Sequence, residues 1–238
     1  MSPTPYTLEF PFIRGRWHTL KDLTVFENDL LLARRQNKQL DHDLRLAQQP
    51  WMKLRNEELY PLLHFARQIH LADNTQFRIC DKGADADIEL KKGKGERRLQ
   101  ITLAGPIWTP KYPNWGYDHK LHMKKLNSDG QSSGWGPFRK EPDGSISNRE
   151  DMLSTDERNQ IYLGGLVKAL EGKRDHRIPD CDLIIHAVTY CEAIDQQTFL
   201  SLANSALSKT SLNNFHNIYI LDYGEGYLVE YTRHAPYT

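Results

Sequence analysis

Between residues 76 and 104 the sequence changes from a helical pattern to one in which apolar and polar residues alternate. Alternation with a period of two predicts strands that have one buried and one solvated face. Glycine clusters at Gly83 and Gly93–Gly95 separate the alternating segments and predict tight turns. The predicted strands are residues 76–80, 85–90 and 98–104. Three short strands joined in this way form an antiparallel meander, so the rest of the chain has to cover its apolar face.

Helical periodicity lies on both sides of this meander. Apolar spacing predicts helices at residues 23–48, 53–71, 155–170 and 196–207, and further strands at 182–188, 218–221 and 227–231. Pro61 falls inside the second helix, which either begins at this proline or is kinked there. The order of elements predicts an α/β fold with a mixed sheet flanked by helices. We expect a mostly helical N-terminal extension at 1–52 and one α/β domain at 53–238, with a long irregular insertion at about 105–150.

Composition limits the classes of function. The 238-residue chain has 31 basic and 31 acidic residues and no formal net charge. Proteins that coat nucleic acid are usually basic, so any binding of nucleic acid has to depend on a local patch. The three cysteines, Cys80, Cys181 and Cys191, have no close pair, which favours reduced thiols. We find no apolar run of about 18 residues and no secretory signal, so we expect a cytoplasmic protein without a membrane partner.

Acidic and polar residues gather on one face of the predicted hairpin. Asp85, Asp87 and Glu89 alternate along its first strand, and Gln100 and Thr102 alternate along the second. Enzymes that cleave phosphodiesters use divalent cations, and Mg²⁺ is held by carboxylate and carbonyl oxygens with water in the remaining positions. The pattern indicates a metal site. It is also typical of a solvated strand face that discourages pairing at a sheet edge.

In these residues and in its element order, the chain resembles the PD-(D/E)xK nuclease superfamily, which has the restriction-endonuclease-like fold. The resemblance covers roughly residues 55–231. It implies that Asp87 binds metal, with Asp85 as the alternative, and that Gln100 binds metal through its side-chain carbonyl. A glutamate from the preceding helix often completes such sites, and here Glu58 is the first choice and Glu57 the second.

The sequence departs from the family pattern at two positions. Gln100 replaces an acidic residue, which removes a negative charge and weakens the expected affinity for Mg²⁺. Thr102 replaces the lysine that orients the attacking water and stabilises the developing charge. Lys168, on the predicted helix 155–170, is the first choice for a replacement cation, and Lys173 is the second.

Other features allow more than one interpretation. We expect the turn between the two strands to lie beside the predicted metal site. It has five cations that could contact phosphate or form a solvated hairpin tip: Lys91, Lys92, Lys94, Arg97 and Arg98. Aromatic residues of the insertion could stack on bases or form a small core: Trp108, Tyr112, Trp115, Tyr117 and Trp135. His119 and His122 could bind zinc, although a closed zinc site needs more ligands. His186, inside an apolar strand, is interpreted as a core histidine.

The sequence therefore predicts a divergent nuclease that depends on Mg²⁺ or Mn²⁺ and hydrolyses phosphodiester bonds. The expected catalytic residues are Asp87, Gln100, Thr102, Glu58 and Lys168, and the expected metal ligands are Asp87, Gln100 and Glu58. The expected partner is nucleic acid, with DNA ahead of RNA. A homodimer is compatible with this expectation, because many nucleases of the fold dimerise to cut two strands. The alternative is a catalytically inactive module of the same fold that binds nucleic acid or a protein.

Overall fold

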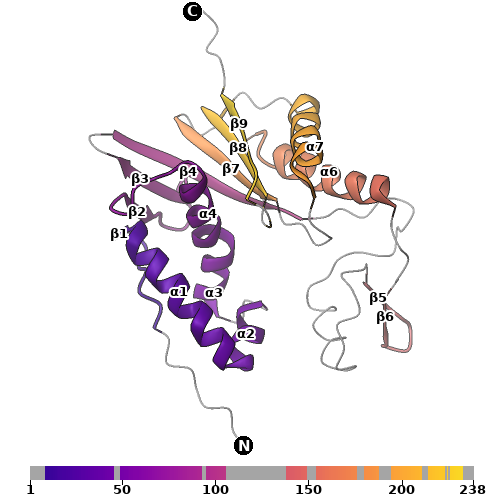
Figure 1. Cartoon of the computed structure of the whole chain (residues 1–238), viewed down its shortest axis with the longest axis horizontal. Coiled ribbons are helices and arrows are strands. Elements are labelled where there is room, and N and C mark those ends of the chain that lie inside the picture. The colour runs from indigo at the N-terminus through magenta and orange to yellow at the C-terminus, as the bar shows by residue number, and fades with distance from the viewer. Residues whose placement is uncertain are drawn as a thin grey trace, which may run out of the picture.

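A seven-stranded mixed sheet forms the centre of the computed structural model. The structure describes residues 9–45, 49–92, 95–105, 138–148, 154–175, 180–187, 194–210, 214–222, 224 and 226–232. The strands of the sheet are β1 (Trp17–Thr19), β2 (Gln76–Ile79), β3 (Ile88–Lys92), β4 (Gly95–Ala104), β7 (Cys181–Ala187), β8 (Asn217–Asp222) and β9 (Leu228–Thr232). They lie side by side in that order (Figure 1). Two further strands, β5 (Phe138–Lys140) and β6 (Ile146–Asn148), form a separate hairpin.

The direction of the strands divides the sheet into an antiparallel half and a parallel centre. β1 to β4 are antiparallel to one another, whereas β4, β7 and β8 are parallel, and β9 returns antiparallel to β8. Parallel neighbours need a crossover connection. Here α6 (Thr155–Glu171) lies between β4 and β7 in the chain, and α7 (Gln196–Lys209) lies between β7 and β8. The predicted α/β class with a mixed sheet is confirmed.

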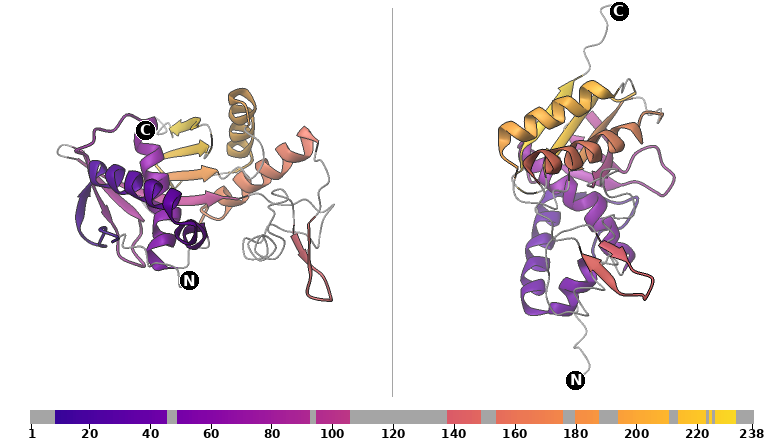
Figure 2. Two further views of the ribbon diagram at one scale, coloured as in Figure 1. Left: turned by 60° about the horizontal axis from the view of Figure 1, so that its bottom comes forward. Right: turned by 90° about the vertical axis from the view of Figure 1, so that its right-hand side faces the viewer.

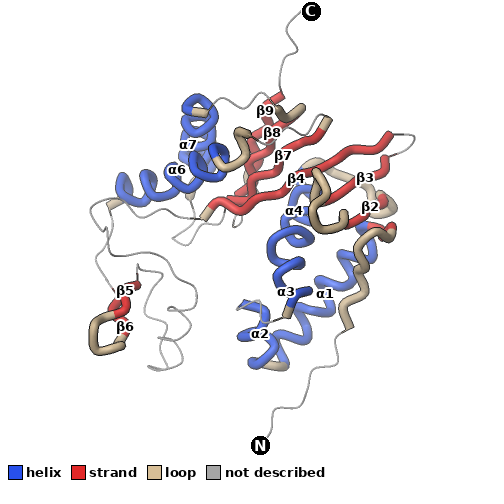
Figure 3. Tube along the Cα trace, turned by 180° about the vertical axis from the view of Figure 1, so that it is seen from behind, coloured by secondary structure: helices blue, strands red, loops and turns tan. Residues whose placement is uncertain are grey.

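The helices form a layer on each face of the sheet (Figures 2 and 3). The first layer consists of α1 (Leu20–Gln36), α2 (Lys38–Arg45), α3 (Pro50–Leu54), a π-helical turn η1 (Arg55–Leu59) and α4 (Tyr60–Gln68). The second layer consists of α6 and α7. Alternate residues of β7 divide between the two cores: Ile184 packs with the first layer, and Leu183 and Ile185 pack with the second. A strand buried on both faces explains the continuous apolar run of β7.

The residues predicted as an N-terminal extension are integrated into this architecture. Thr19 caps α1 through a capping box with Asp22, and the buried face of α1 joins the same hydrophobic core as β2, β3 and β4. The buried residues of α1 are Leu20, Leu23, Phe26, Glu27 and Leu30. β1 also pairs directly with β2. A helix with one apolar face is stabilised mainly by packing, and here the sheet provides the surface on which it packs.

Most predicted elements are observed with small shifts at their ends. The predicted strand 85–90 begins at Ile88, the predicted strand 98–104 begins earlier at Gly95, and the first predicted helix is interrupted at Asn37. Pro61 stands in the first turn of α4, after the π-helical turn. The predicted insertion contains the β5–β6 hairpin, and its residues 106–137 and 149–150 lie outside the described residues. Among the described residues, no helix is long and apolar enough to cross a membrane.

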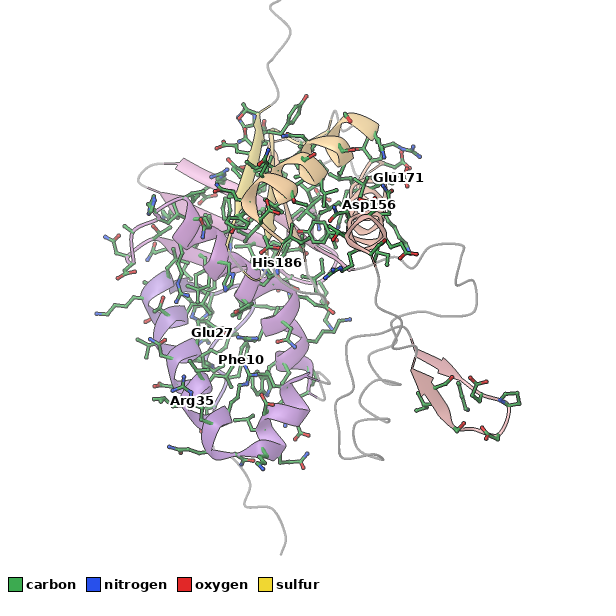
Figure 4. All side chains as sticks on the ribbon, turned by 45° about the vertical axis from the view of Figure 1, so that its right-hand side comes forward. Phe10, Glu27, Arg35, Asp156, Glu171 and His186 are labelled. Carbon is green, nitrogen blue, oxygen red and sulfur yellow. The ribbon has the colours of Figure 1, made fainter. Side chains whose placement is uncertain are left out.

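His186 is buried in the interior between the two helical layers, where its side chain is labelled in Figure 4. Its ring lies 5.6 Å from that of His64 and 6.2 Å from that of Tyr60, both on α4. Burial, with a smaller effect of the neighbouring His64, lowers the pKa of His186 to about 3. The interpretation as a core histidine agrees with this position, because the folded protein holds a neutral imidazole there.

We expect His186 to make the fold sensitive to acid. In the unfolded chain this imidazole is protonated below its ordinary pKa of 6.5, whereas in the folded chain it stays neutral until the pH reaches about 3. The free energy of unfolding therefore decreases as the pH is lowered from 6.5 toward 3. Between pH 6.5 and 4.5 the contribution is about 2 kcal/mol. Urea unfolding at both values should show that His186→Met loses less stability on acidification than the wild type. Equal losses in the two proteins would contradict this assignment.

Candidate active site

Asp87 lies immediately before β3 and is held against β4. Its backbone N–H donates to the carbonyl of Leu99 at 2.9 Å, so pairing between the strands continues to this residue. The side-chain Oδ2 accepts hydrogen bonds from Gln100 Nε2 at 2.9 Å and from the backbone N–H of Ile101 at 2.7 Å. The two donors fix the orientation of the Asp87 carboxylate.

Gln100 and Thr102 point toward the layer of α6 and α7. They pair in register with Leu183 and Ile185 of β7, which belong to the core of that layer. Gln100 is buried and Thr102 is half-buried. In this structure Gln100 donates its amide N–H to Asp87, which differs from the predicted role of its carbonyl as a metal ligand. A residue that holds a ligand in this way acts on the metal through that ligand.

Glu58 comes from the π-helical turn η1, which contacts β4. Such turns are rare and occur frequently at functional sites. Glu58 Oε1 accepts a hydrogen bond from Arg14 Nη2 at 3.1 Å. Its other oxygen, Oε2, is buried and has no hydrogen-bond partner among the described residues. Burial raises the pKa of Glu58 to about 7, Arg14 opposes this rise, and the negative charge of Asp87 adds to it.

Glu58 and Asp87 are close enough for their charges to interact, and we call them the acidic pair. The negative charge of Asp87 disfavours the ionised form of Glu58, which adds to the rise in the pKa of Glu58. Glu57 also feels Asp87: burial raises the pKa of Glu57, Lys53 lowers it, and Asp87 raises it again. Lys53 Nζ lies 3.8 Å from Glu57 Oε2 on the exposed side of the helix. Of the two glutamates, Glu58 is therefore the one directed into the site.

The cation near Asp87 is Lys173, which follows the end of α6. Burial lowers the pKa of Lys173 below its ordinary value, and the charge of Asp87 partly offsets this effect. Lys168, the predicted first choice, is exposed on α6. Lys173 lies in the turn that follows α6, so the two lysines belong to different elements. We therefore place Lys173 ahead of Lys168 as the candidate cation.

The remaining acidic residues of the predicted strand lie outside the pair. Asp85 is exposed in the bend that precedes β3, so it does not share the strand face with Asp87 as predicted. Glu89 is on β3 and forms an ion pair with Arg78 of β2. Of the three, Asp87 is the residue whose charge affects the pKa of Glu58.

The donor set suits a hard divalent cation. Mg²⁺ is commonly bound through one or two carboxylates with waters in the other positions, which matches Asp87 and Glu58. The unpartnered Oε2 of Glu58 supplies an oxygen for such a cation. Among the described residues there is no group of three or more His, Cys, Asp and Glu side chains that could enclose a metal. The predicted zinc site at His119 and His122 lies outside the described residues.

The basic turn lies away from this pair, contrary to expectation. Asp87 precedes β3 and the turn follows it, so the two are at opposite ends of the strand, roughly 17 Å apart. Arg97 is directed inward to Asp182 and Tyr219 and does not point to solvent as a phosphate ligand would. Lys91 is exposed and Arg98 half-buried on β3 and β4. Of the other two predicted contacts, Lys94 is outside the described residues and only the backbone of Lys92 is described.

We expect Gln100→Glu to couple the stability of the fold to metal. The new carboxylate faces Asp87 where an amide now donates, so without a cation two negative charges oppose each other at hydrogen-bond distance. The free energy of unfolding should fall by about 1–3 kcal/mol in chelator. Mn²⁺ should restore thermal stability in Gln100→Glu more than it stabilises the wild type. A metal-independent loss would show that no cation enters this site.

Sequence reasoning did not identify Arg14, which contacts Glu58 from the loop before β1 and also donates to the carbonyl of Cys80. The printed sequence has no signal for this contact, because Arg14 and Glu58 are separated by 44 residues. The aromatic residues predicted to stack on bases in the insertion, from Trp108 to Trp135, lie outside the described residues.

Comparisons of the chain with protein-family models, curated proteins and solved structures found no match.

Proposed function

We propose that this protein is a divergent metal-dependent nuclease of the restriction-endonuclease-like fold. The observation that carries the proposal is the acidic pair of Asp87 and Glu58, in which one buried oxygen has no hydrogen-bond partner among the described residues. The order helix, three antiparallel strands, helix and parallel strand supports it, since the resemblance implies this order. The pair stands at the meander, where the family places its ligands.

The residues of the site divide into four roles. Asp87 and Glu58 hold Mg²⁺ or Mn²⁺, and Gln100 orients Asp87 through its hydrogen bond. When bound, the metal supplies an activated water and neutralises charge that develops on the phosphate. Lys173 provides a positive charge beside Asp87, as the family lysine does. Thr102 occupies the position of that lysine on β4 and has no charge to contribute.

A catalytically inactive binding module is the second candidate. Two observations favour it: Asp87 already accepts two hydrogen bonds from the protein, and Arg14 already binds one oxygen of Glu58. Both contacts reduce the need of the carboxylates for a metal. This candidate predicts that binding to nucleic acid is the same with metal and with chelator.

The two candidates are separated by a cleavage assay on the purified full-length chain. Plasmid DNA, single-stranded DNA and RNA are each incubated with Mg²⁺, Mn²⁺ or chelator. The nuclease proposal predicts cleavage that requires metal and that Asp87→Ala abolishes, with Asp85→Ala as the matched control because Asp85 is exposed outside the pair. Absence of cleavage by the wild type with every substrate and metal would overturn the nuclease proposal in favour of the binding module.

A further inference from the structure

Among the described residues, the strands β1 to β3 are covered by helices on one face only, whereas β4 also contacts α6 on its other face. The apolar residues of β2 and β3 all belong to the core beneath α1 and α4: Phe77, Ile79, Ile88 and Leu90. The intervening residues point to the other face. In Figure 3, α6 and α7 lie beside the parallel strands, at the other end of the sheet from β1 and β2. No helix or strand of the described residues covers the face of β1 to β3 opposite the core, and this face carries polar side chains.

The register places a cross-strand row on this open face. Trp17 of β1 pairs with Arg78, Arg78 pairs with Glu89, and Glu89 pairs with Arg98. Glu89 and Arg78 form an ion pair. Lys91 stands in the next row, two residues further along β3. We call these residues the Trp17 row: Trp17, Arg78, Glu89, Arg98 and the adjoining Lys91.

Trp17 is the aromatic member of the row and is partly exposed. The guanidinium of Arg78 lies 4.9 Å from the centre of its ring, and Lys91 Nζ lies 5.7 Å from it. The Arg78 side chain is 36% exposed, and Lys91 is exposed as well. A partly exposed indole flanked by cations has the chemistry that binds bases by stacking and phosphates by charge.

The Trp17 row is next to the acidic pair. Glu89 is two residues from Asp87 along the chain, a separation of ~7 Å in a strand. The side chains of Glu89 and Asp87 therefore project from the same face of the sheet, in adjacent cross-strand rows. A strand of nucleic acid that crosses the Trp17 row would continue over Asp87 without leaving the sheet.

We propose that the open face of β1 to β3 binds single-stranded nucleic acid, with a base stacked on Trp17 and phosphate beside Lys91. This inference rests on the proposed function in one respect: the path of the bound nucleic acid is chosen so that it leads to Asp87. A single strand fits because its bases have exposed faces, whereas those of a duplex are stacked on one another. Glu89 and Glu96 are paired with cations on this face, so their negative charges reduce its non-specific attraction for polyanions.

The test is the affinity for a labelled oligothymidine and for a labelled duplex, measured by fluorescence anisotropy in chelator so that nothing is cleaved. We expect tighter binding of the single strand. Trp17→Ala should raise its Kd about 5- to 150-fold, and Trp17→Phe should retain most of the affinity, which also shows that the strand β1 still forms. Lys91→Glu should weaken binding and reduce its dependence on salt concentration. The control is Lys38→Glu, the same change at an exposed lysine of α2 on the opposite face of the sheet, which should alter neither.

The outcomes separate this inference from the nuclease proposal. Equal Kd values for Trp17→Ala and the wild type, or no preference for the single strand, would overturn the inference, whatever the cleavage assay shows. If Trp17→Ala loses affinity while the wild type never cleaves, the binding face stands and the nuclease proposal falls.

Discussion

Asp182→Ala should destabilise the protein by about 3–5 kcal/mol, because it removes a buried carboxylate that three donors share. Arg97 forms an ion pair with Asp182, and Asn217 donates to its Oδ1 from the backbone at 2.9 Å and from the side chain at 2.8 Å. The side chain of Asp182 is only 4% exposed. Its loss leaves the Arg97 guanidinium beside Phe65 and Tyr219 without its carboxylate. Such a loss is a large part of the free energy of unfolding of most domains.

The matched control is Asp41→Ala, which breaks an ion pair with Arg34 at the surface. Both of these side chains are more than a quarter exposed, at 26% and 29%. Exposed pairs contribute about 0–1 kcal/mol, so this change should be nearly neutral in urea unfolding. Equal effects of Asp182→Ala and Asp41→Ala would contradict a structural role for the contact between Asp182 and Arg97.

Lys173→Ala should reduce metal-dependent cleavage about 100- to 1000-fold, which is the effect of removing one preorganised electrostatic contact to a transition state. The reason is its position, since the charge of Asp87 acts on Lys173 and the lysine is half-buried after the end of α6. Single-turnover rates on the substrate that the wild type cleaves measure the effect.

Lys168→Ala is the matched control for Lys173→Ala, because Lys168 is exposed on α6 and its removal should leave the rate unchanged. Lys173→Arg should retain part of the rate, since it keeps a positive charge. If Lys168→Ala is the inactive variant, or if Lys173→Ala cleaves at the wild-type rate, the assignment of the cation is wrong.

The element order could be predicted from the sequence because hydrophobic period separates strands from helices so clearly here. The meander was predicted from alternation, and the start of α6 from Ser154 and the acidic residues that follow it, which form a capping box. β1 could not be predicted, because three residues are too short to establish a period. The π-helical turn η1 escaped prediction as well, since a single added residue in a helix leaves no clear mark on apolar spacing.

Within the site, only contacts between residues of the same hairpin could be predicted from the sequence. Asp87 and Gln100 are joined by one hairpin, and the structure brings them into hydrogen-bond contact. The orientation of Arg97 depends on Asp182, which is 85 residues away in sequence. The position of the basic turn was a different kind of error, because a turn that follows a strand cannot lie beside the residue that precedes it. The pairing register of β3 and β4 is enough to show that the turn and Asp87 lie at opposite ends of β3.

Direct titration with Mn²⁺ tests the central claim, which is that Asp87 and Glu58 form one metal site. Isothermal titration calorimetry on the wild type, Asp87→Ala, Glu58→Gln and Asp85→Ala requires no substrate and no cleavage. The account predicts saturable binding by the wild type and by Asp85→Ala, and loss of that binding in Asp87→Ala and Glu58→Gln. Binding that survives in both of those variants, or that is absent from the wild type, would contradict it.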